Sequence, residues 1–174
     1  MTDFSQLGPY DDAWVVLFKN ETKFLMKLLP EDYLLEFHHI GSTAIPEMPA
    51  KPIIDIGVMI TSFVDADLKI RPIMRDHGYA YKWCDERGPG FITFSKMDDE
   101  HAYHVHMAVE DHDFWDCLYF REYLKRNPIE AKTYFDLKNE LAKQFAENHI
   151  AYNAGKEEYI KRITEIAKRE LEEF

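Results

Sequence analysis

The sequence predicts a mixed α/β domain of the α+β type, in which a β-sheet is flanked by helices and the last third of the chain is helical. Two observations support this fold class: strand-like segments joined by turns dominate the middle of the chain, and helical periodicity follows residue 113. The 174 residues, 46% of them apolar, are enough for one domain with a substantial core. Because the chain shows no linker or repeat, we expect residues 1–174 to form a single domain.

The N-terminal half is expected to contain two helices and two strands. Acidic residues precede the first helix as candidate N-caps, and a proline follows it. The second strand is a run of β-branched residues, which is typical of a largely buried strand. The expected elements are an arm at residues 1–10, a helix from Asp11 or Asp12 to about Leu29, a strand at 34–40, a strand at 53–60 and a helix at 63–77.

The C-terminal half is expected to contain three strands and then three helices. Tight turns between the strands favour an antiparallel meander. Pro128 suits the first turn of a helix, and an Asn-Ala-Gly sequence at 153–155 predicts a break before the last helix. The expected strands lie at 79–84, 91–97 and 101–109, and the expected helices lie at 113–127, 128–148 and 156–172.

The stretch from His38 to Val58 is the strongest candidate for a functional site. Asp55 lies inside an apolar run, where a carboxylate is costly to bury without a proton, a cation or a hydrogen-bond donor. The turn Gly41-Ser42-Thr43 offers backbone N–H groups and two hydroxyls, which suit a phosphate, although such residues also form turns for their own sake. Lys51 precedes Asp55 on the same segment and is a candidate phosphate contact.

Two histidines give a second candidate group. His104 and His106 are two residues apart on an expected strand, so both side chains point to the same face. Two imidazoles on one face can bind a transition metal, contact a phosphate or relay a proton, or they can simply hydrogen-bond to their neighbours. His39 and Asp55 would join them if their strands were adjacent.

Three segments of the chain resemble the GrpB family. Residues 38–55 read HHIGSTAIPEMPAKPIID, close to the family block H-I-G-S-T-A-x-P-G-x-x-A-K-P-I-I-D, with Glu47 in place of the glycine. Residues 101–110, HAYHVHMAVE, resemble the family's H-x-H strand, and residues 120–125, FREYLK, resemble its F-R-D-Y-L-R block. The spacing of Tyr134, Lys138, Tyr152, Lys156 and Tyr159 is also similar.

The resemblance implies a fold and a set of roles. GrpB proteins are grouped with the polymerase-β-type nucleotidyltransferases, which implies a mixed or antiparallel sheet flanked by helices. In that fold a Gly-Ser turn holds a triphosphate and an Asp-x-Asp/Glu strand holds divalent metal. Gly41, Ser42 and Asp55 match this pattern, whereas Gly57 replaces the second acid.

These roles make Asp55, His104 and His106 the expected catalytic and metal-binding residues. Gly41, Ser42, Thr43 and Lys51 are the expected contacts to a nucleoside triphosphate, with Mg²⁺ as its companion ion. Three functions remain open: nucleotidyl transfer to an acceptor, ligand binding without catalysis, and hydrolysis at a transition-metal site built on Asp55 and the two histidines. Lys138 and Lys156, by contrast, are expected to be helix-surface lysines.

Charge and composition restrict the class of partner. The net charge of −11 argues against general nucleic-acid binding, which needs clustered cations, but it allows one small phosphate-bearing ligand in a local basic pocket. We find neither a signal peptide nor an apolar run of about 20 residues that could span a bilayer. Cys84 and Cys117 fit neither a disulfide framework nor a paired-thiolate metal motif. We therefore expect a cytoplasmic protein with two reduced thiols; the sequence gives no indication of oligomeric state.

Overall fold

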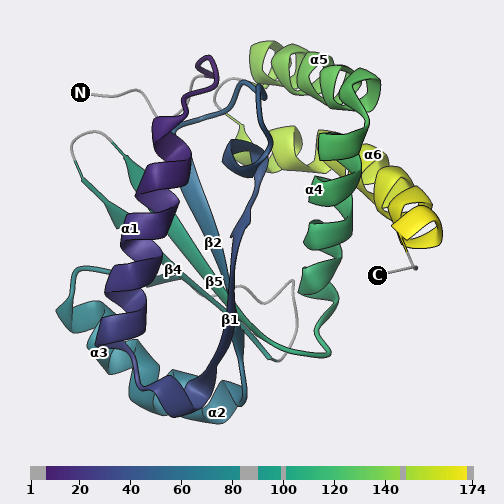
Figure 1. Ribbon diagram of the computed structural model, residues 1–174. Coiled ribbons are helices and arrows are strands. Elements are labelled where there is room, and N and C mark those ends of the chain that lie inside the picture. The colour runs from purple at the N-terminus through teal and green to yellow at the C-terminus, as the bar shows by residue number, and fades with distance from the viewer. Residues whose placement is uncertain (1–6, 83–89, 99–100, 146–147, 172–174) are drawn as a thin grey trace.

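A five-stranded mixed sheet forms the centre of the computed structural model, which describes residues 7–82, 90–98, 101–145 and 148–171 (Figure 1). The strand order is β1-β2-β5-β4-β3; β2 and β5 are parallel, and the other neighbours are antiparallel. The mixed fold class is confirmed, and β3, β4 and β5 form the expected antiparallel meander. The strands are β1 (Leu34–Ile40), β2 (Ile53–Ile60), β3 (Ala80–Lys82), β4 (Phe91–Met97) and β5 (Ala102–Val109).

One face of the sheet packs on the larger apolar core. Ile54, Ile56 and Val58 of β2 are fully buried on this face, because alternate residues of a strand point to opposite sides. They pack with α1 (Ala13–Leu28) and with the helical segment after β2, which contains α2 (Phe63–Asp65), the π-helical turn η3 (Ala66–Ile70) and α3 (Arg71–Asp76). Residue 55 therefore points to the other face of the sheet.

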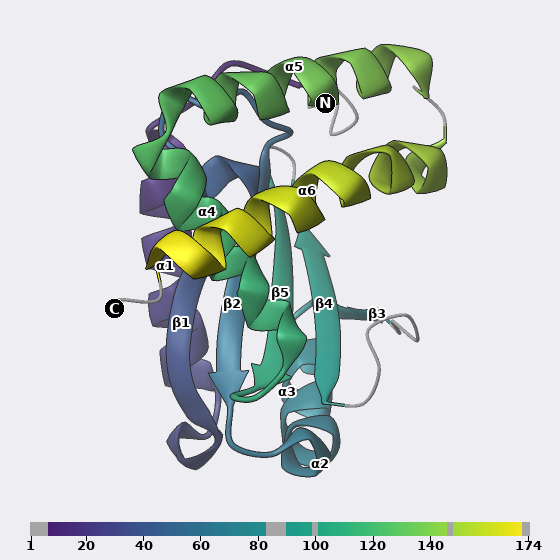
Figure 2. The same ribbon diagram turned by 90° about the vertical axis from the view of Figure 1, so that its right-hand side faces the viewer.

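The C-terminal helices cover that other face. Figure 2 shows α4 and α6 crossing in front of the sheet, with α5 along one end. A short 3₁₀ turn, η5 (Asp113–Trp115), precedes them and packs against β1, β4 and β5 through Phe114 and Trp115. The helices are α4 (Asp116–Arg126), α5 (Pro128–Gln144) and α6 (His149–Leu171).

The predicted break at residues 153–155 is wrong. Helix α6 is continuous from His149 to Leu171, so this sequence lies within its second turn. Gly155 lies at a close approach of two helices: a Cβ at this position would lie 2.5 Å from Leu141 Cδ2 of α5, so the Leu141 side chain would have to move. The glycine therefore lets two helices approach each other, where the sequence pattern suggested a helix end.

The loop between β1 and β2 is ordered by local contacts. It contains the 3₁₀ turn η2 (Ser42–Ala44), and Ala50 pairs with Gly8 of the N-terminal segment through two backbone hydrogen bonds of 2.9 and 3.0 Å. Glu47, the residue that departs from the family block, has φ 61°. That left-handed conformation favours glycine, which explains why the family block has glycine here.

Three further predictions concern membrane spans, the two cysteines and the end of the strand at 79–84. No helix among the described residues is long and apolar enough to cross a membrane. Cys117 is half-buried, whereas Cys84 lies outside the described residues, as does the end of the strand predicted at 79–84. A third 3₁₀ turn, η1 (Glu31–Tyr33), joins α1 to β1.

Candidate functional site

Asp55 and the two histidines meet on the face of the sheet that α4 and α6 cover. Parallel pairing of β2 with β5 places Asp55 beside His104 and Gly57 beside His106. Asp55 Oδ1 lies 3.4 Å from His104 Nδ1 and 3.3 Å from His106 Nε2. The strand register therefore brings together the three residues that the sequence singled out, although they are about 50 positions apart in the chain.

The environment keeps Asp55 ionised. Burial raises the pKa of this carboxyl, but hydrogen bonds from His104 and His106 outweigh burial and hold the pKa below its usual range. The His106 ring is held in turn by Thr93, whose Oγ1 is 3.2 Å from His106 Nδ1, and by stacking on Phe91 with ring centroids 5.9 Å apart. The cluster is a fixed carboxylate flanked by two imidazoles.

Gly41 lies directly against the Asp55 carboxylate. Its φ of +71° is one that L side chains rarely adopt, and a Cβ at this position would lie 2.3 Å from Asp55 Oδ2. Only glycine meets both requirements. The Gly-Ser turn and the acid are therefore one structural unit, as the sequence predicted.

The two hydroxyls of the turn have different surroundings. Thr43 is 2% exposed, and its Oγ1 donates to the Ile53 carbonyl at 3.1 Å and lies 3.2 Å from His39 Nε2. Ser42 Oγ instead accepts a hydrogen bond of 3.1 Å from Lys138 Nζ. Thr43 thus ties the loop to β2, whereas Ser42 faces a charged group from α5.

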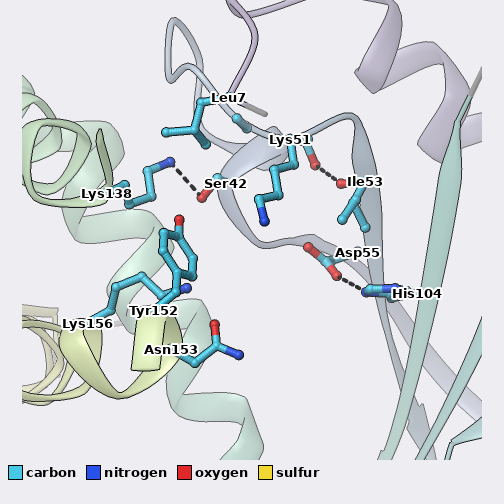
Figure 3. Close-up of a pocket in the computed structure, with 12 residues that line it drawn as sticks. Leu7, Ser42, Lys51, Ile53, Asp55, His104, Lys138, Tyr152, Asn153 and Lys156 are labelled. Carbon is cyan, nitrogen blue, oxygen red and sulfur yellow. Dashed lines mark hydrogen bonds and ion pairs between the residues drawn. The ribbon is translucent and has the colours of Figure 1, made fainter. Parts of the chain in front are cut away.

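Beside Asp55 lies a cavity of about 560 Å³, in the size range of small-molecule sites (Figure 3). Lys51 enters from the loop and Lys138 and Lys156 from the helices, while Asp55 and His104 form the sheet side. Tyr152 lies between two of the lysines: its ring centroid is 5.1 Å from Lys51 Nζ and 4.3 Å from Lys156 Nζ. The remaining lining residues are Leu7, Ser42, Thr43, Ala50, Ile53 and Asn153.

The expectation that Lys138 is a surface lysine is wrong, and Lys156 is half-buried at the edge of the cavity. Lys138 is 2% exposed, and its Nζ donates to Ser42 Oγ and to the Pro49 carbonyl at 2.9 Å. Burial, with a smaller contribution from Lys156, lowers the pKa of Lys138 to about 7. Burial and the nearby Lys51 lower the pKa of Lys156 to about 8. Both ammonium groups are therefore held where an anion would stabilise their charge.

A signal for these two lysines was present in the sequence. Lys138 and Lys156 belong to the spaced set of tail residues that resembles the family, together with Tyr152. Their helices, however, carry many other lysines on exposed faces, so composition could not separate the buried ones. Lys138 is distinguished from the exposed lysines by its contacts with Ser42 and Pro49 of the β1–β2 loop.

His39 does not join the cluster. It pairs with Ile56 across the β1–β2 ladder, so its side chain lies on the α1 face of the sheet, where it stacks on Phe18 with ring centroids 4.6 Å apart. Burial lowers the pKa of His39 to about 4, which keeps the ring neutral. β1 is adjacent to β2, as the prediction required. Alternate residues of a strand point to opposite faces, however, so the His39 ring points away from Asp55.

Gly57, which replaces the second acid, lies under a tryptophan. A Cβ at this position would lie 3.1 Å from Trp115 Cζ3. Trp115 is 8% exposed and anchored by a hydrogen bond of 2.8 Å from Nε1 to the Val109 carbonyl. A carboxylate at position 57 would have to displace this ring, so adding one cannot serve as a simple test for latent metal catalysis.

The donor set fits the expected magnesium chemistry poorly. Mg²⁺ prefers oxygen ligands in octahedral geometry, whereas the cluster offers one carboxylate and two imidazoles, all within 4.8 Å of one another. Imidazole suits transition metals better than Mg²⁺. A magnesium ion at this place would depend on oxygen atoms from a ligand.

Comparison with known proteins places the sequence among named relatives. A model of the GrpB protein family matches residues 5–166. The chain is 38% identical to UPF0157 protein YqkA of Bacillus subtilis over 92% of its own length, but it spans only 46% of YqkA. It is 29% identical to glutamate-rich protein GrpB of Alkalihalophilus pseudofirmus, with 90% of the chain and 92% of that protein covered.

Solved structures agree with the sequence comparison. The GrpB protein of Enterococcus faecalis superposes with a TM-score of 0.84 at 33% identity, covering 95% of this chain and 99% of that one. Two structures of the Cid1 poly(U) polymerase superpose with TM-scores of 0.53 and 0.55 at 16% and 15% identity, covering 87% of this chain and about half of theirs. The second likeness shows a shared nucleotidyltransferase-like fold.

Proposed function

The chain belongs to the GrpB family, and from this premise we propose that it binds a phosphate-bearing small molecule, with a nucleotide as the leading class, in the cavity beside Asp55. The main support for the proposal is the charge of the cavity lining. The cavity lining contains three lysines against one carboxylate, in a chain whose net charge is −11. Such a local reversal of charge suits an anionic ligand, because charge-assisted hydrogen bonds to phosphate are strong.

Lys138 is the central contact of the proposed site. Its two hydrogen-bond partners, Ser42 Oγ and the Pro49 carbonyl, are uncharged, so neither neutralises the ammonium. Keeping an uncompensated charge buried is costly. A phosphate at the Ser42 turn would supply the missing negative charge, with Lys51 and Lys156 reaching it from opposite sides of Tyr152.

Nucleotidyl transfer to an unidentified acceptor is the proposed chemistry, and the likeness in fold to Cid1 supports it. The Cid1 structures are described as bound to Mg 3′-dATP and to MgGTP. In the present chain a magnesium ion would be held chiefly by the phosphates of the nucleotide, since the protein offers one carboxylate. Gly41, Ser42, Thr43 and Lys51 would position the triphosphate, while Asp55, His104 and His106 would orient the acceptor or hold its proton.

Two alternatives use the same residues. A binding module without catalysis would bind nucleotide and release no product. A metal-dependent hydrolase, favoured by the Asp55–His104–His106 cluster, would release phosphate or a nucleoside monophosphate without an acceptor. Chromatography of radiolabelled ATP, CTP, GTP and UTP after incubation with the protein separates these outcomes from transfer.

Titration calorimetry with pyrophosphate and the four nucleoside triphosphates, in a buffer containing a chelator, tests the binding itself. We expect saturable binding that Lys138→Gln abolishes and that Lys132→Gln leaves intact. Lys132 is the matched control because it lies on the same helix with its side chain 73% exposed. Absence of binding, or equal loss in both variants, would refute the proposal.

A further inference from the structure

We infer that Asp55, His104 and His106 hold one transition-metal ion of the zinc type, in place of the magnesium pair that the fold would suggest. This inference deepens the proposed function, because Asp55 and His104 also line the phosphate cavity. Only the role of the ion, next to a bound phosphate, rests on the proposed function. Binding of the ion can be measured without any nucleotide.

Two of the three distances between the donor atoms match a tetrahedral site, and all three atoms lie within 4.8 Å of one another. Asp55 Oδ1 is 3.3 Å from His106 Nε2 and 3.4 Å from His104 Nδ1. With metal–ligand bonds of about 2.0–2.1 Å, neighbouring ligands of a tetrahedral ion lie about 3.3–3.4 Å apart. The side chains are therefore spaced so that one ion could replace the two ring protons that Asp55 Oδ1 now accepts.

The His106 ring is oriented as a metal ligand needs to be. A ligating histidine usually donates its second ring N–H to a nearby acceptor, which leaves a lone pair on the nitrogen that faces the ion. A bound ion would replace the proton that His106 Nε2 shares with Asp55, and Thr93 Oγ1, at 3.2 Å from Nδ1, could accept the remaining ring N–H. Phe114, with its ring centroid 5.5 Å from that of His106, restricts the ring further.

The site has room for one ion. The strand position that carries a second acid in the polymerase-β-type pattern is Gly57, and Trp115 fills the space above it. Gly57 also pairs with His106 across the β2–β5 ladder. A Cβ at position 57 would contact Trp115 and Ile40, so this strand position supplies no second carboxylate, and the protein ligands among the described residues are limited to Asp55, His104 and His106.

Three protein ligands leave a fourth position open. Because Asp55 and His104 border the cavity, that position faces the proposed phosphate site. Catalytic zinc sites typically have three protein ligands and an open position, whereas structural ones are closed by four. The open position would accept a water molecule or a phosphate oxygen.

Spectroscopic titration with Co²⁺ tests the inference directly. Protein without a histidine tag is treated with chelator, dialysed against metal-free buffer and titrated with Co²⁺, which absorbs visible light strongly only in tetrahedral or five-coordinate sites. We expect the absorption to saturate at one ion per chain and to be abolished by one equivalent of Zn²⁺, while excess Mg²⁺ leaves it unchanged. Absence of the absorption, saturation at two ions, or displacement by Mg²⁺ would overturn the inference.

Variants locate the site. His104→Gln and His106→Gln should each abolish the cobalt absorption, whereas His77→Gln should keep it, because His77 is an exposed residue of the helical segment after β2 that contacts the Ile73 carbonyl. Thr93→Val keeps all three ligands and should weaken Co²⁺ binding by about 10–100-fold. Equal binding in wild type and His106→Gln would place the ion elsewhere and refute the assignment.

The outcomes remain separable from those of the proposed function. Pyrophosphate binding is measured in chelator, and metal binding is measured without phosphate. Loss of cobalt binding with intact pyrophosphate binding would reject the ion alone. Cobalt binding without pyrophosphate binding would keep the ion and reject the phosphate site.

Discussion

Gly41 is the residue at which backbone conformation and the candidate site depend on each other most directly. Its positive φ forms the turn that presents Ser42, and its missing side chain leaves space for the Asp55 carboxylate. Gly78 also has a positive φ, of +85°, yet a Cβ there would meet nothing within 4 Å. Gly78 is therefore a glycine of positive φ at which a side chain would displace no neighbour, in contrast to Gly41.

Gly41→Ala should destabilise the fold more than Gly78→Ala. Alanine at positive φ is strained at both positions, and the strain is greater at position 41, where φ 71° and ψ −172° form a combination that only glycine adopts readily. At position 41 the Cβ would also push Asp55 away from its histidines. Urea denaturation measures both free energies of unfolding, and calorimetry measures pyrophosphate binding. Equal destabilisation of the two variants, with binding retained in both, would contradict the role given to Gly41.

The lowered pKa values of Lys138 and Lys156 predict how anion binding depends on pH. Both lysines lose their protons at lower pH than usual, with pKa values of about 7 and about 8. A bound anion favours the protonated forms, so affinity should be highest below pH 7 and fall as the pH rises through these values. Binding near pH 7–8 should accordingly take up protons.

Sulfate is the suitable probe for this dependence, because its own charge stays constant between about pH 6 and about pH 9, where unperturbed lysines also remain charged. Calorimetry at several pH values, in buffers of different ionisation enthalpy, gives both affinity and proton uptake. A constant affinity over this range would show that the two lysines do not titrate in the free site.

At the level of secondary-structure elements, the sequence predicted the strands well because their signals are local. β1, β2, β4 and β5 carry alternating or β-branched patterns and lie within one residue of their expected bounds. The helix ends were harder, since Gly155 and its neighbours resemble a helix stop. Their role depends on Leu141 from another helix, and such a contact leaves no mark in the local pattern.

Gly155→Ala tests this interpretation of α6. Alanine favours a helix over glycine by about 1 kcal/mol, but overpacking against Leu141 costs about 1–3 kcal/mol. We expect a net loss of stability, together with weaker pyrophosphate binding, because Lys156 is the next residue. Chemical denaturation of Gly155→Ala, Leu141→Ala and the double variant forms a cycle, and a favourable coupling between the two changes is expected.

The neighbouring exposed position provides the control for that cycle. Ala154→Gly should cost only the propensity difference of about 1 kcal/mol and leave binding unchanged. If Gly155→Ala instead stabilises the protein, as an exposed helical glycine would allow, the close approach of α5 and α6 is not a constraint on the fold.

For the molecule as a whole, charge is distributed unevenly: an acidic chain surrounds one basic cavity. The acidic net charge could be read from the sequence. The basic cavity could not, because its three lysines are far apart in the chain and meet only after folding. Asp55 and the histidines were predictable from their burial pattern and spacing. Lys138 and Lys156 were not, because burial of a helical lysine depends on what packs over it.

This distribution predicts selectivity for small anions over nucleic-acid polymers. Backbone binding to DNA or RNA requires many released counterions, and one recessed group of lysines cannot provide them. Fluorescence anisotropy with a labelled DNA duplex and with single-stranded RNA should show no saturable binding at physiological salt. Binding of either polymer that weakens steeply with added salt would reveal an extended basic surface and contradict this prediction.

A crystal structure of the protein grown with ATP tests the central claim most directly. The claim predicts triphosphate density at the η2 turn, with phosphate oxygens within hydrogen-bond distance of Lys138 Nζ and of at least one of Lys51 and Lys156. ATP bound elsewhere, or a cavity that holds only water at a saturating ATP concentration, would contradict it.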